Sequence, residues 1–443
     1  MRTELPALIR LAIPVVLAEI GWMSMGIVDT LMVGPLGPAA IGATGMSSAV
    51  FTALAIFGMG LMLGLDTLVS HAFGARRIED CVRWLHQGVA LACVASPVVM
   101  ALAWIAFATV DWWGLHPDVR VLVASYLRVI SLSAFPLLLY AALRRYLQGR
   151  HIVRPVMAAL ISANLVNAGA NWVLIYGRLG MPALGVEGSA WATSIARLYM
   201  ALFLLATVYW VHRQDPDHPR IPFAIDLPRL KRLITLGFPA ASQITLEVGV
   251  FAAATMLAGR LDPIASASNQ IALNVVSLAF MVPLGLASAA AVRVGHAVGA
   301  GDAGRAVQTG WTALTLGAAL MVAIAVALFA WPEPLLRSFT TDPRVIDIGA
   351  RLLRIAAAFQ LFDGTQAVAT GVLRGLGETR MPMIVNVIGH WVFGLPAGYA
   401  LCFVFGWGVT GLWVGLSIGL VIAGMALTVE WGRRTRYLLA ATS

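Results

Sequence analysis

Three acidic residues stand inside long apolar segments of the sequence. Asp29 lies in the run from Leu11 to Val33, and Glu247 and Asp363 lie in similar runs of the second half. Hydrocarbon cannot solvate a carboxylate, and burying one there costs about 2.5 to 17 kcal/mol, depending on the reference method. Such an acid must face protein or water, where it often binds or relays a cation. We interpret all three as candidate sites for a bound cation or a proton.

Asparagine side chains recur at helical spacing in another apolar run. Asn164, Asn167 and Asn171 are spaced i, i+3 and i+7, which places the three amides on one face of a helix. Polar stripes of this kind can simply hold neighbouring membrane helices together. Hard oxygen ligands also suit Na⁺, and a stripe of three beside a helix that carries Asp29 favours a cavity. We predict that the three amides surround Asp29.

Polar residues flank the two acids of the second half. Gln243 precedes Glu247 by four residues, and Gln360 precedes Asp363 by three, so each pair shares a helix face. The carboxylates suit a proton as well as Na⁺. Besides the two acids, the residues predicted to line a second cavity are Gln243, Gln270, Asn274, Gln360 and His390.

Two other acids are harder to interpret. Asp66 lies near the end of an apolar run, where water can reach it, and this position favours a structural role. Glu19 lies about 80° around a helix from Asp29, and its role is left open.

The composition predicts a membrane protein that spans the bilayer many times. Of the 443 residues, 60% are hydrophobic and 12% are charged, whereas a soluble domain has roughly 45–50% apolar and about 25% charged residues. The mean hydropathy is +0.84. The net charge of +9 does not indicate nucleic-acid binding, because the basic residues fall in short segments between apolar runs. The three cysteines show no metal-binding spacing, and we predict no metal site other than one for Na⁺.

Twelve apolar runs reach the length of about 20 residues that a transmembrane helix needs. Basic residues concentrate in alternate connections, which predicts that both termini lie in the cytoplasm and that the chain resides in the cytoplasmic membrane. The polar connection at 212–230 is predicted to be a cytoplasmic linker between six-helix lobes at 1–211 and 231–443. The twelve runs are 7–33, 44–71, 86–110, 121–143, 153–176, 184–211, 232–258, 267–296, 306–331, 345–373, 382–405 and 409–431.

The two halves repeat each other. A single constant offset, which we call the repeat shift, aligns Pro14 with Pro239 and Gly60 with Gly285, among other identities, without a gap. An even number of helices in each half makes this a parallel repeat, which is typical of secondary transporters with sites near the repeat interface.

The buried acids break this repeat. Asp29 aligns with Ala254, and Glu247 aligns with Trp22. A purely structural acid would more readily be duplicated, so the asymmetry favours a functional role for both.

Several motifs together resemble the multidrug and toxic compound extrusion (MATE) transporters, in particular their NorM-like branch. The resemblance covers the full length of the chain. It implies an all-α, V-shaped bundle of twelve helices in two six-helix lobes. The stretches that carry it are Ile27-Val28-Asp29-Thr30 with Gly34, Gly64 to Ala75, Phe238-Pro239 with Glu247, Arg293-Val294-Gly295 with Gly299-Ala300-Gly301, and Gly371 to Gly377.

The resemblance also implies functional residues. Asp29 and Asn167 match polar residues of the family's N-lobe cavity, and Thr193 matches a threonine on its sixth helix. Glu247 and Asp363 match the acids of its C-lobe. Some members carry an aspartate where this chain has Asn171, so the N-lobe site here has one charge fewer, and the coupling ion is left as Na⁺ or H⁺.

The predicted function is therefore export of cationic or amphipathic small molecules in exchange for Na⁺ or H⁺ by alternating access. We expect a monomer in the lipid bilayer, without a cofactor or enzymatic activity. One alternative is a flippase for lipid-linked oligosaccharides, although flippases usually line the cavity with several basic residues, and the mid-helix positions here are acidic and amide. A second alternative is a membrane-embedded transferase, but the sequence lacks an Asp-rich diphosphate–metal motif and a closely spaced His–Asp pair.

Overall fold

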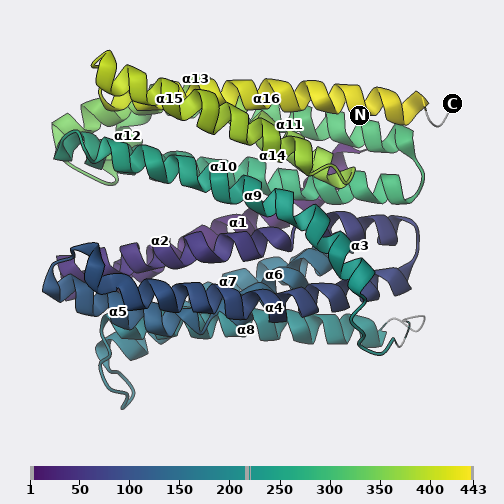
Figure 1. Cartoon of the computed structure of the whole chain (residues 1–443), viewed down its shortest axis with the longest axis horizontal. Coiled ribbons are helices and arrows are strands. Elements are labelled where there is room, and N and C mark those ends of the chain that lie inside the picture. The colour runs from purple at the N-terminus through teal and green to yellow at the C-terminus, as the bar shows by residue number, and fades with distance from the viewer. Residues whose placement is uncertain (1–3, 215–218, 220, 441–443) are drawn as a thin grey trace. The chain divides into compact units, whose positions relative to one another are not determined.

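The computed structural model describes residues 4–214, 219 and 221–440 (Figure 1). Within these ranges the chain forms helices joined by short connections, and no β-strand occurs. The chain folds into two compact units. The N-terminal unit comprises Leu17–Ala241, and the C-terminal unit comprises Ser242–Ser443 together with Met1–Val16.

The N-terminal unit contains most of the first half of the chain (Figure 1). Short 3₁₀ turns at Gly34–Leu36 and Val110–Trp113 extend two of its helices. Its helices are the later part of α1 (Leu5–Val33), α2 (Pro38–Leu61), α3 (Gly64–Gly74), α4 (Ile78–Thr109), α5 (Pro117–Ser131), α6 (Ala134–Gly149), α7 (Arg154–Tyr176), α8 (Val186–Gln214) and the first part of α9 (Leu227–Ala258).

The C-terminal unit contains the rest of α9 and the start of α1. Between α14 and α16 the helix widens to π geometry at Val387–Gly394 and Ala400–Val404, around the proline-containing α15 (Leu395–Tyr399). Its other helices are α10 (Pro263–Gly299), α11 (Ala303–Ala330), α12 (Pro332–Arg337), α13 (Pro343–Gly375), α14 (Arg380–Asn386) and α16 (Val409–Ala440).

Each predicted apolar run coincides with helical structure. Of the described residues, ten helical segments are long and apolar enough to cross a membrane, and the bent pair α5–α6, with an angle of 48°, raises the number to eleven. The remaining predicted run is α13, which is 33 residues long but carries several charged residues toward its ends. The protein is a multi-pass membrane protein.

The helices α1 and α9 each belong to both units. The division falls after Val16 in α1 and after Ala241 in α9, and the repeat shift aligns these two positions with each other. The beginning of each helix therefore belongs to the compact unit of the other half. The predicted lobe limits at 211 and 231 did not include this exchange. The functional division at the 212–230 connection stays a prediction.

Two repeat-related glycines admit the exchanged helices. A Cβ atom on Gly60 would lie 2.5 Å from the Cα of Ala241, and one on Gly285 would lie 2.8 Å from the Cα of Val16. Both distances are shorter than any van der Waals contact, so only glycine allows this backbone approach. Small residues serve the same purpose at many contacts between membrane helices.

We expect Gly60→Ala to destabilise the protein by about 1–3 kcal/mol, the usual cost of overpacking a well-packed interior. The measurement is thermal unfolding of the purified protein in detergent. Gly45→Ala on the same helix is the control, because nothing lies within 4 Å of the added Cβ there. Equal melting temperatures for the two variants would contradict the close approach.

Candidate ion-coupling sites

Asp29 lies on α1 within a cluster of hydrogen-bond donors from α7 and α8. Asn167 Nδ2 and Asn171 Nδ2 donate to its Oδ1 at 3.0 and 2.7 Å, and Thr193 Oγ1 donates to its Oδ2 at 2.8 Å. Asn171 also donates to Asn167 Oδ1 at 3.1 Å. All four side chains are buried. The structure thus joins four of the predicted N-lobe residues around one carboxylate.

The donor set determines what this cluster can stabilise. Three hydrogen bonds to both oxygens of Asp29 replace part of the hydration that the carboxylate loses on burial. The amide N–H groups of Asn167 and Asn171 and the hydroxyl of Thr193 donate to the carboxylate, so each of these hydrogen bonds stabilises negative charge on Asp29, while burial opposes that charge. A bound cation would need the amide oxygens of Asn167 and Asn171 instead, which requires those side chains to turn.

Asn164 does not join this cluster, contrary to the prediction. Its Nδ2 donates to the backbone oxygens of Gly21 at 2.8 Å and Leu160 at 2.9 Å. The spacing of i, i+7 between Asn164 and Asn171 amounts to about 10 Å along a helix, so a shared face does not bring the two amides to one point. Asn164 instead ties α7 to α1 about two turns before Asp29.

Arg197 is a buried cation near Asp29 that sequence reasoning missed. It lies one helical turn after Thr193 on α8, is 8% exposed, and interacts electrostatically with Asp29. Its Nη1 donates to Ser133 Oγ at 2.6 Å, and its guanidinium lies 4.8 Å from the ring centroid of Phe51. The spacing of i, i+4 between Thr193 and Arg197 is the signal that would have indicated it.

Glu247 and Asp363 lie in the C-terminal unit, on α9 and α13. Glu247 is half-buried and accepts a hydrogen bond from Gln366 Nε2 at 3.2 Å. Asp363 is 6% exposed, makes no hydrogen bond within the described residues, and interacts electrostatically with Glu247. Gln366 was not predicted, although it stands at i+3 from Asp363 on the same helix.

Gln366 extends this polar group toward the π segment. Its Nε2 also donates to Asn386 Oδ1 at 2.7 Å, and the backbone oxygen of Asn386 lies 3.1 Å from His390 Nδ1. His390 is fully buried, and its Nε2 has no partner within the described part of the chain. A chain of hydrogen bonds through Gln366 and Asn386 thus connects His390 to Glu247.

Of the other predicted C-lobe residues, Gln243 also hydrogen-bonds with Glu247, whereas the rest contact other groups. Gln243 lies one turn before Glu247, and its Nε2 donates to Thr370 Oγ1 at 3.4 Å. Gln360 is buried with its Nε2 3.7 Å from the Sδ of Met321. Gln270 and Asn274 are hydrogen-bonded to each other at 3.3 Å rather than to either acid. The structure therefore does not place these last two with the acids.

The two acids of uncertain role both form ion pairs in the N-terminal unit. Glu19 pairs with Arg144, and both side chains are buried. Asp66 lies 3.3 Å from Arg145. Each of these two acids has a basic partner. They differ in this respect from Asp29, Glu247 and Asp363, for which the structure of the described residues contains no ion pair.

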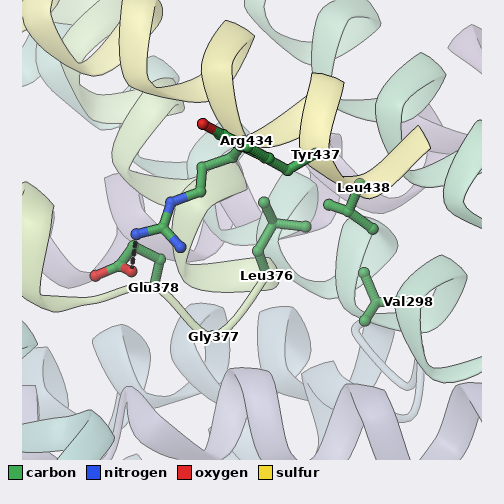
Figure 2. A pocket seen from close by; sticks show the side chains of 7 residues that line it. All are labelled: Val298, Leu376, Gly377, Glu378, Arg434, Tyr437 and Leu438. Carbon is green, nitrogen blue, oxygen red and sulfur yellow. Dashed lines mark hydrogen bonds and ion pairs between the residues drawn. The ribbon is translucent and has the colours of Figure 1, made fainter. Parts of the chain in front are cut away.

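A surface cavity of about 460 Å³ lies in the C-terminal unit (Figure 2). Arg434 Nη2 donates to Glu378 Oε2 across it at 2.6 Å, so its charges are paired. Its lining contains no predicted site residue and consists of Val298, Leu376, Gly377, Glu378, Arg434, Tyr437 and Leu438.

A repeated bundle of membrane-spanning helices is typical of a secondary transporter, and so are acids in both halves that make no ion pair within the described part of the chain. The MatE family model matches two segments, 14–173 and 239–400, whose first residues are aligned by the repeat shift. The chain belongs to the MatE family. The predicted resemblance and the predicted repeat are both confirmed.

Similar proteins span nearly the whole chain. A probable multidrug resistance protein NorM of Mesorhizobium japonicum is 36% identical, covering 98% of this chain and 95% of that protein. The multidrug resistance protein MdtK of Edwardsiella ictaluri is 32% identical, covering 97% and 96%. The relatives' names do not favour the flippase alternative.

Solved structures share the fold. The eukaryotic MATE transporter AtDTX14 superposes with a TM-score of 0.89 at 20% identity, covering 100% of this chain and 99% of that one. A MOP superfamily transporter from Pyrococcus furiosus gives 0.87 at 20% identity, covering 98% and 96%. The predicted all-α fold of twelve helices in two lobes is confirmed.

Proposed function

We propose that the protein is a secondary active multidrug efflux transporter that exchanges cationic or amphipathic small molecules for Na⁺ or H⁺. The names of the relatives support multidrug resistance as the role, and the buried acids favour substrates that are cationic. The observation that carries the coupling concerns Asp29 and Glu247, which lie in helices long and apolar enough to span a membrane, and Asp363, which is buried on α13. None of the three makes an ion pair within the described residues. Each of them needs a counter-charge when it is ionised in a low dielectric.

The exchange follows from competition for these carboxylates. A proton, a Na⁺ ion or a cationic drug can each supply the missing positive charge, and one carboxylate accommodates one of them at a time. Loading the ion therefore releases the drug, and unloading it restores the drug site. Asn167, Asn171 and Thr193 stabilise Asp29 in the interval when neither is bound.

The surroundings of the transporter are part of the proposal. We place the chain in the bacterial cytoplasmic membrane with both termini in the cytoplasm, because its bacterial relatives are resistance proteins and its basic residues favour that orientation. It acts as a monomer. It uses a coupling ion and no cofactor, and it does not catalyse a reaction on its substrate. The 212–230 connection links two lobes that alternate in access.

Transport by purified protein in liposomes tests this function. An imposed proton or Na⁺ gradient should drive accumulation of a fluorescent cationic drug, and an ionophore that collapses that gradient should stop it. Drug accumulation that is indifferent to both gradients would contradict ion-coupled exchange.

A further inference from the structure

Arg197 differs from two other arginines inside the N-terminal unit in having no acid in contact with it among the described residues. Arg144 contacts Glu19, and Arg145 contacts Asp66. Arg197 bonds instead to the neutral Ser133, and its Nε has no hydrogen-bond partner among the described atoms. A buried cation without a contacting acid is costly and is usually functional within a membrane.

The acid nearest to Arg197 along the described contacts is Asp29, because Thr193, which donates to Asp29 Oδ2 at 2.8 Å, precedes Arg197 by one turn of α8. Tyr126 on α5 also interacts electrostatically with Asp29, and its hydroxyl lies 2.9 Å from Ser48 Oγ. Glu19, on the same helix as Asp29, is already neutralised by Arg144. Asp29 and Arg197 are thus opposite charges that are both buried and that do not touch.

The C-terminal unit has no equivalent of this arginine at the corresponding position. Gly185 and Gly188 align with Gly408 and Gly411 at a slightly smaller offset than the repeat shift, and there Arg197 corresponds to Leu420, which is fully buried. At this repeat-related position, a leucine in the C-terminal unit thus stands where the N-terminal unit carries Arg197.

We propose that Arg197 is a positioning residue whose fixed charge favours the ionised form of Asp29 and thereby sets the pH at which a proton displaces drug there. The idea rests on the proposed function. A positive charge nearby opposes every cation that approaches Asp29, so it weakens the binding of protons and of cationic drugs together. Asp29 is the only acid of its hydrogen-bonded cluster, because position 171 carries an asparagine, so Arg197 acts on a single negative charge there.

The test is the affinity of a cationic drug, measured by fluorescence against pH, for the full-length protein in detergent. In Arg197→Gln we expect the pH midpoint of binding to rise by about one unit, the order expected for one charge in a medium of effective dielectric about 20. The sign follows because removing the cation lets the proton bind Asp29 at higher pH. Affinity for the cationic drug at high pH should also rise, about tenfold, and affinity for a neutral analogue should stay unchanged.

Matched variants separate the charge from the packing. Arg197→Lys keeps the charge and should keep the wild-type midpoint, and Ser133→Ala removes only the hydrogen bond and should do the same. In the background of Asp29→Asn, Arg197→Gln should shift nothing. A wild-type midpoint in Arg197→Gln, or an equal shift in Ser133→Ala, would overturn the role of the charge. Wild-type binding that is independent of pH would instead overturn the exchange at Asp29 itself.

A second inference concerns the starts of the two exchanged helices, each of which is fixed by a charged cluster. Glu4 precedes α1 and pairs with Arg293, with Arg305 at 3.0 Å and with Thr309 at 3.2 Å. These contacts lie within the C-terminal unit.

The start of α9 is fixed in the N-terminal unit. Arg229 pairs with Asp80 at 2.9 Å and lies 5.2 Å from the ring centroid of Trp84. The repeat shift aligns Glu4 with Arg229, Arg305 with Asp80 and Thr309 with Trp84. The same pair of positions is therefore used twice, with the signs of the charges reversed.

We infer that this reversal specifies which unit receives which helix. If α1 began in the unit of its own half, Glu4 would take the place of Arg229 and face Asp80. Arg229 would likewise face Arg305. Like charges at both points disfavour that arrangement, while opposite charges favour the exchanged one.

A charge-swap cycle on the full-length protein tests this inference. Arg229→Glu and Asp80→Arg should each lower the melting temperature in detergent, and the double variant should recover most of the loss. Arg232→Glu is the control, because it makes the same charge change at an exposed position of α9. The combination of Glu4→Arg with Arg229→Glu preserves the net charge but places like charges at both pairings of the exchanged arrangement, and it should lower the melting temperature by more than Arg229→Glu alone. No recovery in the cycle, or a wild-type melting temperature for the combination together with wild-type proximity of Gly60 and Ala241 in cysteine cross-linking, would overturn the inference.

Discussion

Asp29→Asn is expected to abolish ion-driven drug release at the N-terminal site while leaving a folded protein that still binds neutral ligands. An asparagine keeps the size of the side chain and one hydrogen-bond acceptor for the donors of Asn167, Asn171 and Thr193. It cannot take up a proton, and it offers a bound cation no charge. The competition between ion and drug should therefore disappear.

The measurement is drug affinity against pH and against Na⁺ concentration, in wild-type and variant protein. Asp347→Asn serves as the control, because Asp347 is exposed and pairs with Arg351 on α13. Identical competition curves for wild type and Asp29→Asn would exclude Asp29 as the exchange residue.

Glu247→Gln and Asp363→Asn are each expected to weaken ion-coupled efflux severely without preventing folding. The two acids interact electrostatically, and no cation of the described chain pairs with them. Two carboxylates that share one site cannot both stay ionised unless a cation or proton is bound, so each depends on the other. Removing either should reduce the response of transport to the ion gradient by at least about tenfold, the usual scale of losing one charge interaction of about 1.4 kcal/mol.

Glu19→Gln provides the contrast for this prediction. Glu19 is also a buried acid, but it is neutralised by Arg144. Its replacement leaves a buried arginine uncompensated and should lower stability, by about 3–5 kcal/mol, while the protein that remains folded keeps its ion dependence. If Glu247→Gln and Asp363→Asn also kept the wild-type dependence, the C-terminal coupling site would lie elsewhere.

Helical spacing and the apolar runs were enough to predict the helices and the place of Asn167 and Asn171 beside Asp29, whereas Thr193 was expected only from the family resemblance. Asn167 and Asn171 are one turn apart, so both reach the same carboxylate. Asn164 shares their helix face but lies at a different position along the helix axis. A shared face does not show which residues lie level with Asp29. Gln270 and Asn274 show the same limit, because a polar pair on a helix can satisfy itself.

Other features depended on which helices pack together. The repeat indicated that Gly60 and Gly285 are equivalent, but not that each admits a helix from the other half of the chain. The exchange of the helix starts is determined by contacts between segments from opposite halves of the sequence. No local sequence pattern gives information about such contacts. Arg197 was missed because its partner, Asp29, lies on α1, far from α8 along the chain.

The most direct test of ion–drug exchange is to run it in reverse. Liposomes that contain the protein are loaded with drug in the absence of any ion gradient, and the internal pH and Na⁺ concentration are followed after dilution. Outward movement of drug should drive protons or Na⁺ inward in the wild type. The triple variant Asp29→Asn, Glu247→Gln and Asp363→Asn should show no such ion movement. Drug efflux from the wild type without movement of either ion, or an undiminished ion flux in the triple variant, would contradict coupling through these three acids.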